Sequence, residues 1–219
     1  CISTDTLING VHFPEGATGQ MVARRSIAAA LSDLAAMGAT PFGMTGALTL
    51  VQVSAPWLKA LSAEIGDLIR QWQVPLLGGN LSQGNELSIT WTVMGLVNPG
   101  EFLLRSGAQV GDDIYISGYP GRAGYALDCL LQRRDVATRL AKHYSQPTPR
   151  LELGEAINGL AHSAIDVSDG LLADLQHLLT ASGVGARIDL AALSADAQLV
   201  AACGVADSVR FALTAGDDY

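Results

Sequence analysis

The chain has 219 residues, of which 49% are hydrophobic and only 16% charged, which excludes a disordered protein and predicts a packed globular one. Its formal net charge of -8 excludes a sequence-independent grip on nucleic acid, because such binding needs clustered Lys and Arg to replace phosphate counterions. A composition rich in Ala, Leu and Gly, with 5% aromatic residues, is typical of an α/β protein.

The cysteine usage indicates a reducing cytoplasm. Cys1, Cys129 and Cys203 are odd in number and show no CxxC spacing, so neither a disulfide framework nor a zinc site is predicted. The most apolar stretch, 27–50, is interrupted by Asp33, glycines and a proline, so we expect no membrane span, and no signal peptide is expected. The chain begins inside a predicted strand and ends at a Gly-Asp-Asp motif, so we expect a fragment with material missing at both ends.

Helix and strand periods alternate in the first half of the chain. Ile27, Leu31 and Leu34 recur at helical spacing, and Gly38 follows them as a C-terminal stop. A later helix opens with a proline near its first turn. Strands are predicted over 2–7, 42–53, 74–77 and 87–97, and helices over 20–37 and 56–72.

A Pro-Gly turn at 98–100 is the predicted boundary between two domains, 1–99 and 100–219. The second domain also mixes helices with strands, so the fold class is α/β (α+β). Its expected elements, in chain order, are a strand over 113–117, a glycine-rich turn over 118–124, helices over 125–133, 136–143 and 151–160, a short apolar strand from 163 that leads to Asp166, an amphipathic helix from Asp169 to 179, a strand over 185–190, a small helix over 195–202 and a strand over 209–213.

Acidic and amide residues at the ends and flanks of these elements are candidate magnesium ligands, because buried carboxylates need partners and Mg²⁺ prefers oxygen. Structural alternatives stay open. Ser168 and Asp169 could cap the helix that follows them, Asp33 could be a solvated helix residue, and 217–218 could form a turn. Asp5 is harder to explain, because Asp is depleted in strands. The candidates are Asp5, Asp33, Asn80, Asp166, Asp169, Asp217 and Asp218.

The sequence contains neither GxxxxGK[ST] nor GxGxxG, so it lacks the common nucleotide-binding motifs. The pair Gly78-Gly79 and the stretch 118–121 could let the backbone approach a phosphate, or could simply form turns. His12, in a loop, could contact a substrate or act as a base, or do neither. Arg105 could bind a phosphate in bidentate fashion or form an ordinary ion pair between domains. No Ser/His/Asp or Cys/His arrangement is evident from the spacing.

Taken together and in order, several segments resemble the thiamine-monophosphate kinase family, which belongs to the superfamily of aminoimidazole ribonucleotide synthetase. The combination of LSDLAAMGA, RSGA and IDVSDGL in that order is highly specific, and the resemblance covers essentially the whole chain. The segments are STDTLINGVHF, LSDLAAMGATP, LLGGN, LLRSGAQVGDDIYISG, PTPRLELG, AIDVSDGLLADLQHLLTASGVGARID and AGDDY.

The resemblance implies a two-domain fold of the aminoimidazole ribonucleotide synthetase type. Its N-terminal α/β domain binds ATP and metal and pairs into a β-barrel across a homodimer, and a C-terminal α/β domain follows. The implied reaction is ATP-dependent phosphorylation of thiamine monophosphate to thiamine diphosphate, by direct in-line transfer with several Mg²⁺ ions and no phosphoenzyme. Phosphoryl transfer depends on positioning and charge neutralisation, which agrees with the lack of an activated nucleophile. Neither nucleic acid nor membrane is expected as a partner.

The resemblance also implies roles for individual residues. It implies metal binding by Ser3, Thr4, Asp5, Asp33, Asn80, Asp166 and Asp169, ATP binding by Gly79, Asn80, Arg105 and Ser168, and substrate binding by His12 and Asp217. Part of the magnesium cluster would thus come from each domain.

This sequence departs from the family pattern in places. The family's GGD reads Gly78-Gly79-Asn80 here, and an amide oxygen can bind Mg²⁺ but carries no charge. The last motif, AGDDY, has Ala215 in place of a glycine and Asp217 where Glu is common. A glycine-Asp-Asp segment that the family carries upstream, and an aromatic residue that it carries downstream, are not in this sequence.

Other functions stay open from the sequence alone. The chain could belong to another enzyme of the superfamily, such as a selenophosphate synthetase or a hydrogenase-maturation protein. It could also be a catalytically silent nucleotide-binding or interaction module, which Asn80 and the apparent truncation favour. Formation of thiamine diphosphate would separate the kinase from both alternatives.

Overall fold

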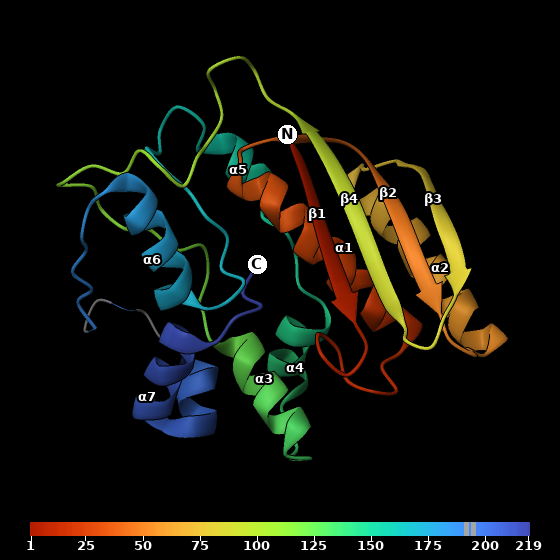
Figure 1. The fold of residues 1–219 in the computed structure, drawn as a ribbon. Coiled ribbons are helices and arrows are strands. Elements are labelled where there is room, and N and C mark those ends of the chain that lie inside the picture. The colour runs from red at the N-terminus through yellow and green to blue at the C-terminus, as the bar shows by residue number, and fades with distance from the viewer. Residues whose placement is uncertain (191–192, 194–195) are drawn as a thin grey trace. The chain divides into compact units, whose positions relative to one another are not determined.

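The computed structural model describes residues 1–190, 193 and 196–219, and within them it confirms an α/β protein with a four-stranded sheet (Figure 1). Within this described part of the chain, every helix is too short or too polar to cross a membrane. The strands are β1 (Ile2–Ile8), β2 (Thr40–Leu50), β3 (Leu76–Gln83) and β4 (Ser88–Leu96), and the helices are α1 (Gly19–Ala36), α2 (Ala55–Trp72), α3 (Arg122–Leu131), α4 (Thr138–Ser145), α5 (Leu151–Ala156), α6 (Leu171–Ser182) and α7 (Ala197–Thr214).

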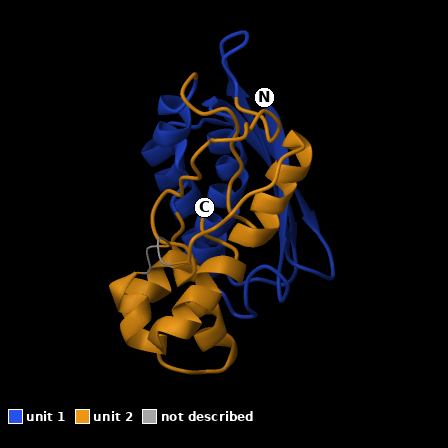
Figure 2. Ribbon diagram, turned by 90° about the vertical axis from the view of Figure 1, so that its left-hand side faces the viewer, with its two compact units in different colours: residues 1–102, 148–158 blue, residues 103–147, 159–219 orange. Residues whose placement is uncertain are grey.

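The chain forms two compact units (Figure 2). Unit 1 contains residues 1–102 and 148–158, and unit 2 contains residues 103–147 and 159–219. The segment 148–158 therefore returns to unit 1, which the sequence did not indicate. Its helix α5 packs closely on α1, because a Cβ atom added to Gly154 would lie 2.1 Å from the carbonyl oxygen of Ala35. The functional roles assigned to 1–99 and 100–219 stay predictions.

The sheet of unit 1 has the strand order β1-β4-β2-β3, with β2 and β3 parallel and the other neighbours antiparallel. Alternate residues of β4, including Ile89, Trp91 and Val93, are buried. These side chains face α1 and α2, which cover one face of the sheet (Figure 1), and the indole nitrogen of Trp91 donates to Ser26 Oγ of α1 at 2.9 Å. The other face, which we call the outer face, carries the side chains between them in register.

Helix α1 matches its prediction to within one residue at each end. Thr18 is its N-cap, and the hydroxyl of Thr18 accepts a hydrogen bond from the amide of Met21 at 3.2 Å. This bond satisfies one of the amides that a helix start leaves open. Gly38 follows the last turn at a φ of +66°, a left-handed conformation that favours glycine.

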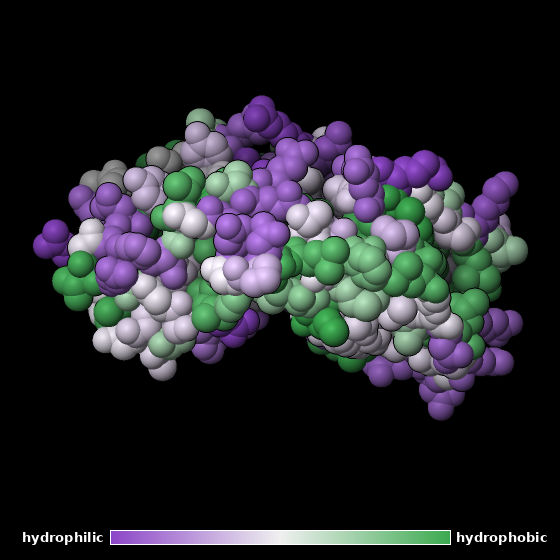
Figure 3. Space-filling view, turned by 90° about the horizontal axis from the view of Figure 1, so that it is seen from above, coloured by the Kyte–Doolittle hydropathy of each residue, from purple (hydrophilic) through white to green (hydrophobic). Residues whose placement is uncertain are grey.

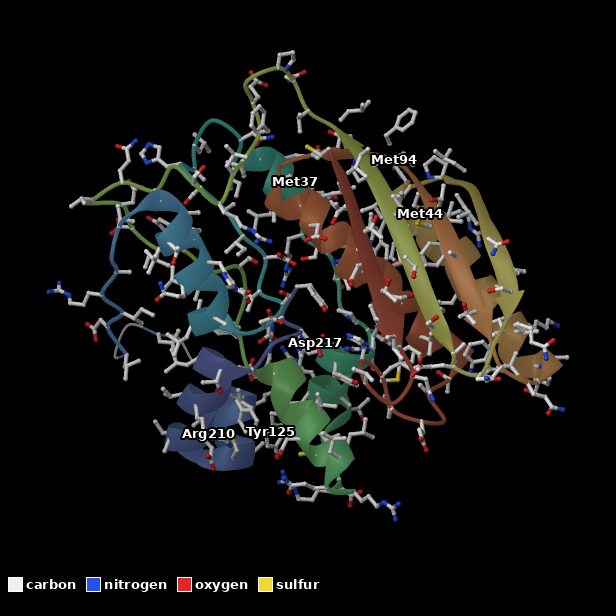
Figure 4. The ribbon with its side chains drawn as sticks, viewed as in Figure 1. Met37, Met44, Met94, Tyr125, Arg210 and Asp217 are labelled. Carbon is white, nitrogen blue, oxygen red and sulfur yellow. The ribbon has the colours of Figure 1, made fainter. Side chains whose placement is uncertain are left out.

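Unit 2 has a core between its helices. Tyr125 of α3 meets Phe211 of α7 edge to face, with ring centroids 5.6 Å apart. Cys129 and Leu140 belong to the same buried cluster. Arg210 lies on the outside of this core, with its guanidinium carbon 4.3 Å from the centroid of the Phe211 ring, and Figure 4 labels Arg210 and Tyr125.

Four predicted strands of the second half are wrong. Residues 209–213 belong to α7, where Ser208, Phe211 and Ala212 are buried at helical spacing, and a short apolar run cannot distinguish these two structures. Residues 113–117, 185–190 and the stretch before Asp166 are neither helix nor strand, because among the described residues of unit 2 no ladder of neighbouring strands pairs with them. The predicted helix at 195–202 begins at Ala197, and after a kink at the non-helical Gly204 a second helical stretch of α7 leads to Thr214, while position 195 lies outside the described residues.

Candidate active site

In unit 1, the structure brings together two of the predicted metal ligands. Ser3 lies on β1 and Asp33 on α1, and the Ser3 hydroxyl donates to Asp33 Oδ2 at 2.5 Å. Asp5 points to the same face of β1 as Ser3, because alternate strand residues share a face and Leu7 on that face is buried. Asp33 is half-buried rather than fully solvated. Two carboxylates and a hydroxyl thus come from this face of β1 and the facing side of α1.

Thr4 and Asn80 lie elsewhere in unit 1. The Thr4 hydroxyl is on the outer face, 3.0 Å from the Thr92 hydroxyl, so only the main-chain oxygen of Thr4 could join a site with Ser3. Asn80 lies on β3, at the sheet edge opposite β1, and its partner in register is Ala47. Three strand spacings, or about 14 Å, separate β1 from β3. In one chain, Asn80 therefore cannot bind the same ion as Asp5.

The pair Gly78-Gly79 lies inside β3 and forms no turn, so the turn interpretation of these glycines is wrong. A Cβ atom on Gly79 would lie 2.1 Å from the carbonyl oxygen of Gly46 on the neighbouring strand. Gly79 is therefore needed for the pairing of β2 with β3, whether or not ATP also contacts it. Gly78 has open space around it instead.

His12 lies in the exposed loop after β1, and the structure fixes its orientation. The His12 Nδ1 atom accepts a hydrogen bond from the amide of Ile8 at 3.1 Å, so a neutral ring carries its proton on Nε2. The buried guanidinium of Arg25 on α1 donates to the carbonyl oxygen of His12 at 3.0 Å. The substrate role of His12 stays a prediction.

In unit 2, one buried carboxylate holds the loop that carries Asp166, Ser168 and Asp169. Asp174 Oδ2 accepts hydrogen bonds from the amides of Ser168, Asp169 and Gly170, each at 3.0 Å. The prediction that Ser168 or Asp169 caps α6 is wrong, because the N-cap residue is Gly170 and the cap has no side-chain hydrogen bond. Sequence reasoning missed Asp174, although its spacing from Leu171 and Leu175 places it on the buried face of α6.

The C-terminal segment 216–218 lies against the same loop. The amide of Asp217 donates to the carbonyl oxygen of Ser168 at 3.1 Å, and the amide of Asp218 donates to the carbonyl oxygen of Val167 at 3.1 Å. A Cβ atom on Gly216 would lie 2.0 Å from the Ser168 oxygen, so this approach requires glycine. Two motifs far apart in the sequence, DVSDG and AGDDY, are thus neighbours in unit 2.

Asp218 connects this segment to the glycine-rich turn before α3. Its carboxylate accepts a hydrogen bond from the amide of Gly121, which is the N-cap residue of α3 and adopts a φ of +95°. Burial raises the pKa of Asp218 to about 6, and it outweighs the bonds from the Gly121 and Ala123 amides and the charge of Arg122, which act in the opposite direction. Figure 4 labels the adjacent Asp217, which lies above α3 in that view.

The segment RSGA, which carries Arg105, is held by the last residue of α6. The Ser182 hydroxyl donates to the carbonyl oxygen of Arg105 at 3.1 Å and accepts from the amide of Ala108 at 3.1 Å. The amide of Ala164 donates to the carbonyl oxygen of Leu104 at 3.0 Å, so this segment adjoins the chain that leads to Asp166. Helix α6 therefore fixes one predicted ATP-binding segment at each of its ends.

The side chains present suit magnesium chemically. The predicted ligands offer only carboxylate, hydroxyl and amide oxygens, the donors that Mg²⁺ prefers, and include no His or Cys that would favour zinc. Among residues 1–190, 193 and 196–219, no group of three or more His, Cys, Asp or Glu residues forms a ready metal site. Ser3, Asp5 and Asp33 fall outside that description, because only two of these three predicted ligands are carboxylates and the third is a hydroxyl.

Comparison with known proteins defines the class. Residues 1–97 match the family model "AIR synthase related protein, N-terminal domain", and residues 109–212 match "AIR synthase related protein, C-terminal domain". The thiamine-monophosphate kinase of Escherichia coli (strain K12) is 43% identical over the whole chain, which covers 68% of that protein.

Solved structures agree with this class. A crystal structure of thiamine-monophosphate kinase from Stenotrophomonas maltophilia K279a is 39% identical, with a TM-score of 0.95 over all of this chain and 72% of its own. AaThiL complexed with AMPPCP and TMP is 27% identical, with a TM-score of 0.93 over the same shares. The chain therefore belongs to the AIR synthase related proteins and, within them, to the thiamine-monophosphate kinase family.

Proposed function

We propose that this protein is an enzyme that phosphorylates thiamine monophosphate at the expense of ATP and forms thiamine diphosphate. The bond between the terminal phosphorus of ATP and its bridging oxygen breaks. A phosphate oxygen of thiamine monophosphate forms the new bond to that phosphorus, and ADP leaves. The kinases at 43% and 39% identity, and the related structure with an ATP analogue and TMP, support this assignment over another enzyme of the superfamily.

One observation within the molecule carries the proposal: the DVSDG and AGDDY motifs are hydrogen-bonded to each other through the main chain of Ser168 and Asp217. The first motif carries the residues proposed to hold metal and ATP, and the second carries the residue proposed to contact the substrate. Direct transfer requires the attacking oxygen and the transferred phosphorus to be held in line, and this contact joins the two sets of residues.

Two sets of oxygen ligands are proposed to hold Mg²⁺. In unit 1 they are Ser3, Asp5, Asp33 and the main-chain oxygen of Thr4, and in unit 2 they are Asp166 and Asp169. Bound Mg²⁺ would supply neutralisation of the charge that two polyphosphate substrates bring together. Arg105, Ser168 and Gly79 are proposed to contact ATP, while His12 and Asp217 are proposed to contact the substrate.

The test is to incubate the full-length protein with ATP, Mg²⁺ and thiamine monophosphate and to follow thiamine diphosphate by chromatography. We expect stoichiometric formation of ADP and thiamine diphosphate. Nucleotide binding without any product would contradict the proposed reaction and favour the silent module. A cytoplasmic location also stays our prediction, and it rests on the cysteine usage.

We further propose that the protein acts as a homodimer, because the outer face of the sheet has the character of an interface. It combines threonines in register, such as Thr4 with Thr92 and Thr6 with Thr90, with apolar residues at its margins. Ile2 and Leu96 are 71% and 62% exposed. Figure 3 shows apolar residues gathered on the right-hand side, where the sheet lies in Figure 1. Burial of such a surface favours association.

A dimer would also give Asn80 a role. In a barrel closed by two sheets, the β3 edge of each sheet adjoins an edge of the other, so Asn80 would reach a site in the second copy. Leu96→Glu should shift the protein to monomers in analytical ultracentrifugation and lower its activity, because a charge enters the interface. Leu58→Glu, on α2, is the matched control and should leave the dimer intact. A Leu96→Glu protein that remains a dimer would contradict this interface.

A further inference from the structure

We propose that Asp174 makes the start of helix α6 a site for cations rather than for phosphate, and so acts as a positioning residue for magnesium-bound nucleotide. The inference rests on the proposed function, which assigns the loop before α6 to metal and ATP. Asp174 itself contacts neither substrate. It acts through the main chain of the residues that do.

The geometry of Asp174 is unusual for a helix residue. It lies in the first turn of α6, is only 3% exposed, and directs one oxygen back to the amides of Ser168, Asp169 and Gly170. A common helix cap stands before the helix and binds amides inside it, whereas Asp174 stands inside the helix and binds amides before it. The bonds therefore shape the loop more than they extend the helix.

The other side of the loop is fixed as well. Gly170 has a φ of +120°, and a Cβ atom on it would lie 2.9 Å from the carbonyl carbon of Thr214. The Ser168 carbonyl oxygen accepts a hydrogen bond from the amide of Asp217. With its amides bound to Asp174 and its carbonyl bound to the C-terminal segment, the loop has little freedom to adopt a different main-chain conformation.

This arrangement changes what the loop can bind. A glycine-containing loop at a helix N-terminus is a favourable place for phosphate, because its free amides and the helix dipole attract anions. Here Asp174 takes up those amides and adds a buried negative charge at the positive end of the helix. The loop then offers the carboxylates of Asp166 and Asp169 to a cation, and the nucleotide binds through that cation.

The inference predicts how nucleotide affinity depends on Mg²⁺. The binding of AMPPCP to the full-length protein is measured by calorimetry, with Mg²⁺ and again with EDTA. We expect Asp174→Ala to weaken binding with Mg²⁺ by about tenfold or more, which corresponds to about 1.4 kcal/mol. Binding in EDTA should stay the same or become tighter, because the freed amides can meet phosphate. The ratio of the affinity for AMPPCP with Mg²⁺ to the affinity in EDTA therefore falls in Asp174→Ala.

Asp174→Asn provides a second variant that keeps the shape and one acceptor oxygen but removes the charge. Its ratio of affinities should lie between those of the wild type and Asp174→Ala. If Asp174→Ala does not fold, the ratio measured for Asp174→Asn tests the inference in its place. Asp196 is the matched control. It is a buried carboxylate of unit 2 that, unlike Asp174, is a helix N-cap, and it accepts hydrogen bonds from the amides of Gln198 and Leu199 of α7 at 2.8 and 3.0 Å. Asp196→Ala should lower the melting temperature without changing the ratio.

A purely structural role for Asp174 would lower the melting temperature and leave the ratio at its wild-type value, and that result would overturn the inference. An equal fall in the ratio for Asp196→Ala would overturn it too. The proposed function is tested separately. A wild-type protein that forms no thiamine diphosphate would overturn that function, while a change in the Mg²⁺ dependence of AMPPCP binding would still support the role of Asp174.

Discussion

The two compact units place their acidic side chains in different ways. In unit 1, Ser3 and Asp5 share a face of β1 because strand residues alternate, and Asp33 is presented by a regular turn of α1. In unit 2, Asp166 and Asp169 lie on a loop whose amides donate to the Asp174 carboxylate and whose carbonyl oxygens accept hydrogen bonds from the C-terminal segment, while the Ser182 hydroxyl holds the neighbouring RSGA segment.

This difference predicts where a substitution should affect only the side chain that is changed and where it should also alter the surrounding main chain. A ladder of main-chain hydrogen bonds survives the loss of one side chain, so unit 1 should keep its shape when a ligand is changed. A loop held by one carboxylate or one hydroxyl loses its shape with that group. Substitutions in both units test this contrast, and the proposed metal ligands should show the largest effects.

The largest effect is expected for Asp166→Asn. It removes the charge of a proposed metal ligand, so we expect a loss of at least about 100-fold in kcat/KM, since even outer partners of a metal site contribute 10- to 100-fold. Folding should be largely unaffected, because the variant relieves repulsion between carboxylates. Titration of Mg²⁺-dependent nucleotide binding checks the assignment, and unchanged binding would show that Asp166 is not a ligand.

The next effect concerns the pair in unit 1. Asp33→Asn should raise the Mg²⁺ concentration needed for half-maximal activity by about 30-fold, and Ser3→Ala by about 10-fold, because a short bond to a carboxylate contributes roughly 1.5–3 kcal/mol. The double variant should be little worse than Asp33→Asn alone, since Asn offers Ser3 only an uncharged acceptor and both changes therefore remove the same charge-assisted 2.5 Å hydrogen bond.

Ser62→Ala is the control for this pair, because it deletes an exposed serine hydroxyl of α2, which donates to the carbonyl oxygen of Lys59 at 3.1 Å and belongs neither to the proposed metal site nor to the outer face. Its Mg²⁺ requirement should match the wild type. Additive effects of Ser3→Ala and Asp33→Asn would instead indicate that the two side chains serve separate ions.

The same contrast explains how far the sequence could predict the structure. Most elements of unit 1 follow from periodicity, and the predicted ranges agree with β1, α1, α2 and β4 to within a few residues, whereas the strand predicted over 74–77 lies at Leu76–Gln83 and includes the two glycines. Asp5 was informative because Asp is unusual in a strand. In unit 2, four predicted strands are wrong, because short apolar runs do not specify whether a partner strand is present.

The site of unit 2 was only partly predictable for a related reason. The contact between Ser168 and Asp217 joins residues that are distant in the sequence, and no local pattern encodes it. Asp174 did leave a signal, since it occupies the apolar face of α6 with Leu171 and Leu175. A carboxylate on an apolar helix face must find a partner, and the nearest amides precede the helix.

A smaller effect is expected from the pH dependence of Asp218. Because burial raises its pKa to about 6, above the ordinary value near 4, the folded protein retains a proton that the unfolded chain has released between these values. The free energy of unfolding should therefore fall as pH rises from about 4 to about 6, by on the order of 2 kcal/mol, and then level off. Urea unfolding in EDTA at pH 4.5 and 7.5 measures this change.

Asp218→Asn should remove that part of the pH dependence and keep an oxygen for the Gly121 amide. Its stability relative to the wild type should therefore increase between pH 4.5 and 7.5. An identical pH dependence in both proteins would show that the Asp218 carboxyl titrates in its ordinary range.

The smallest effect is expected for Ser182→Ala. This variant removes both hydrogen bonds that hold the RSGA segment, so Arg105 should become less well placed, and KM for ATP should rise about threefold. The KM for thiamine monophosphate should change little, because the bonds reach neither His12 nor Asp217.

Ser145→Ala is the matched control, since Ser145 ends α4 and its hydroxyl donates to the Ala141 carbonyl at 3.0 Å. If both variants raised KM for ATP equally, the loss of a serine at a helix end, and not the placement of Arg105, would explain the result. If only Ser182→Ala does so, a single hydroxyl at the end of α6 positions part of the unit 2 site, whereas in unit 1 that task falls to the regular elements themselves.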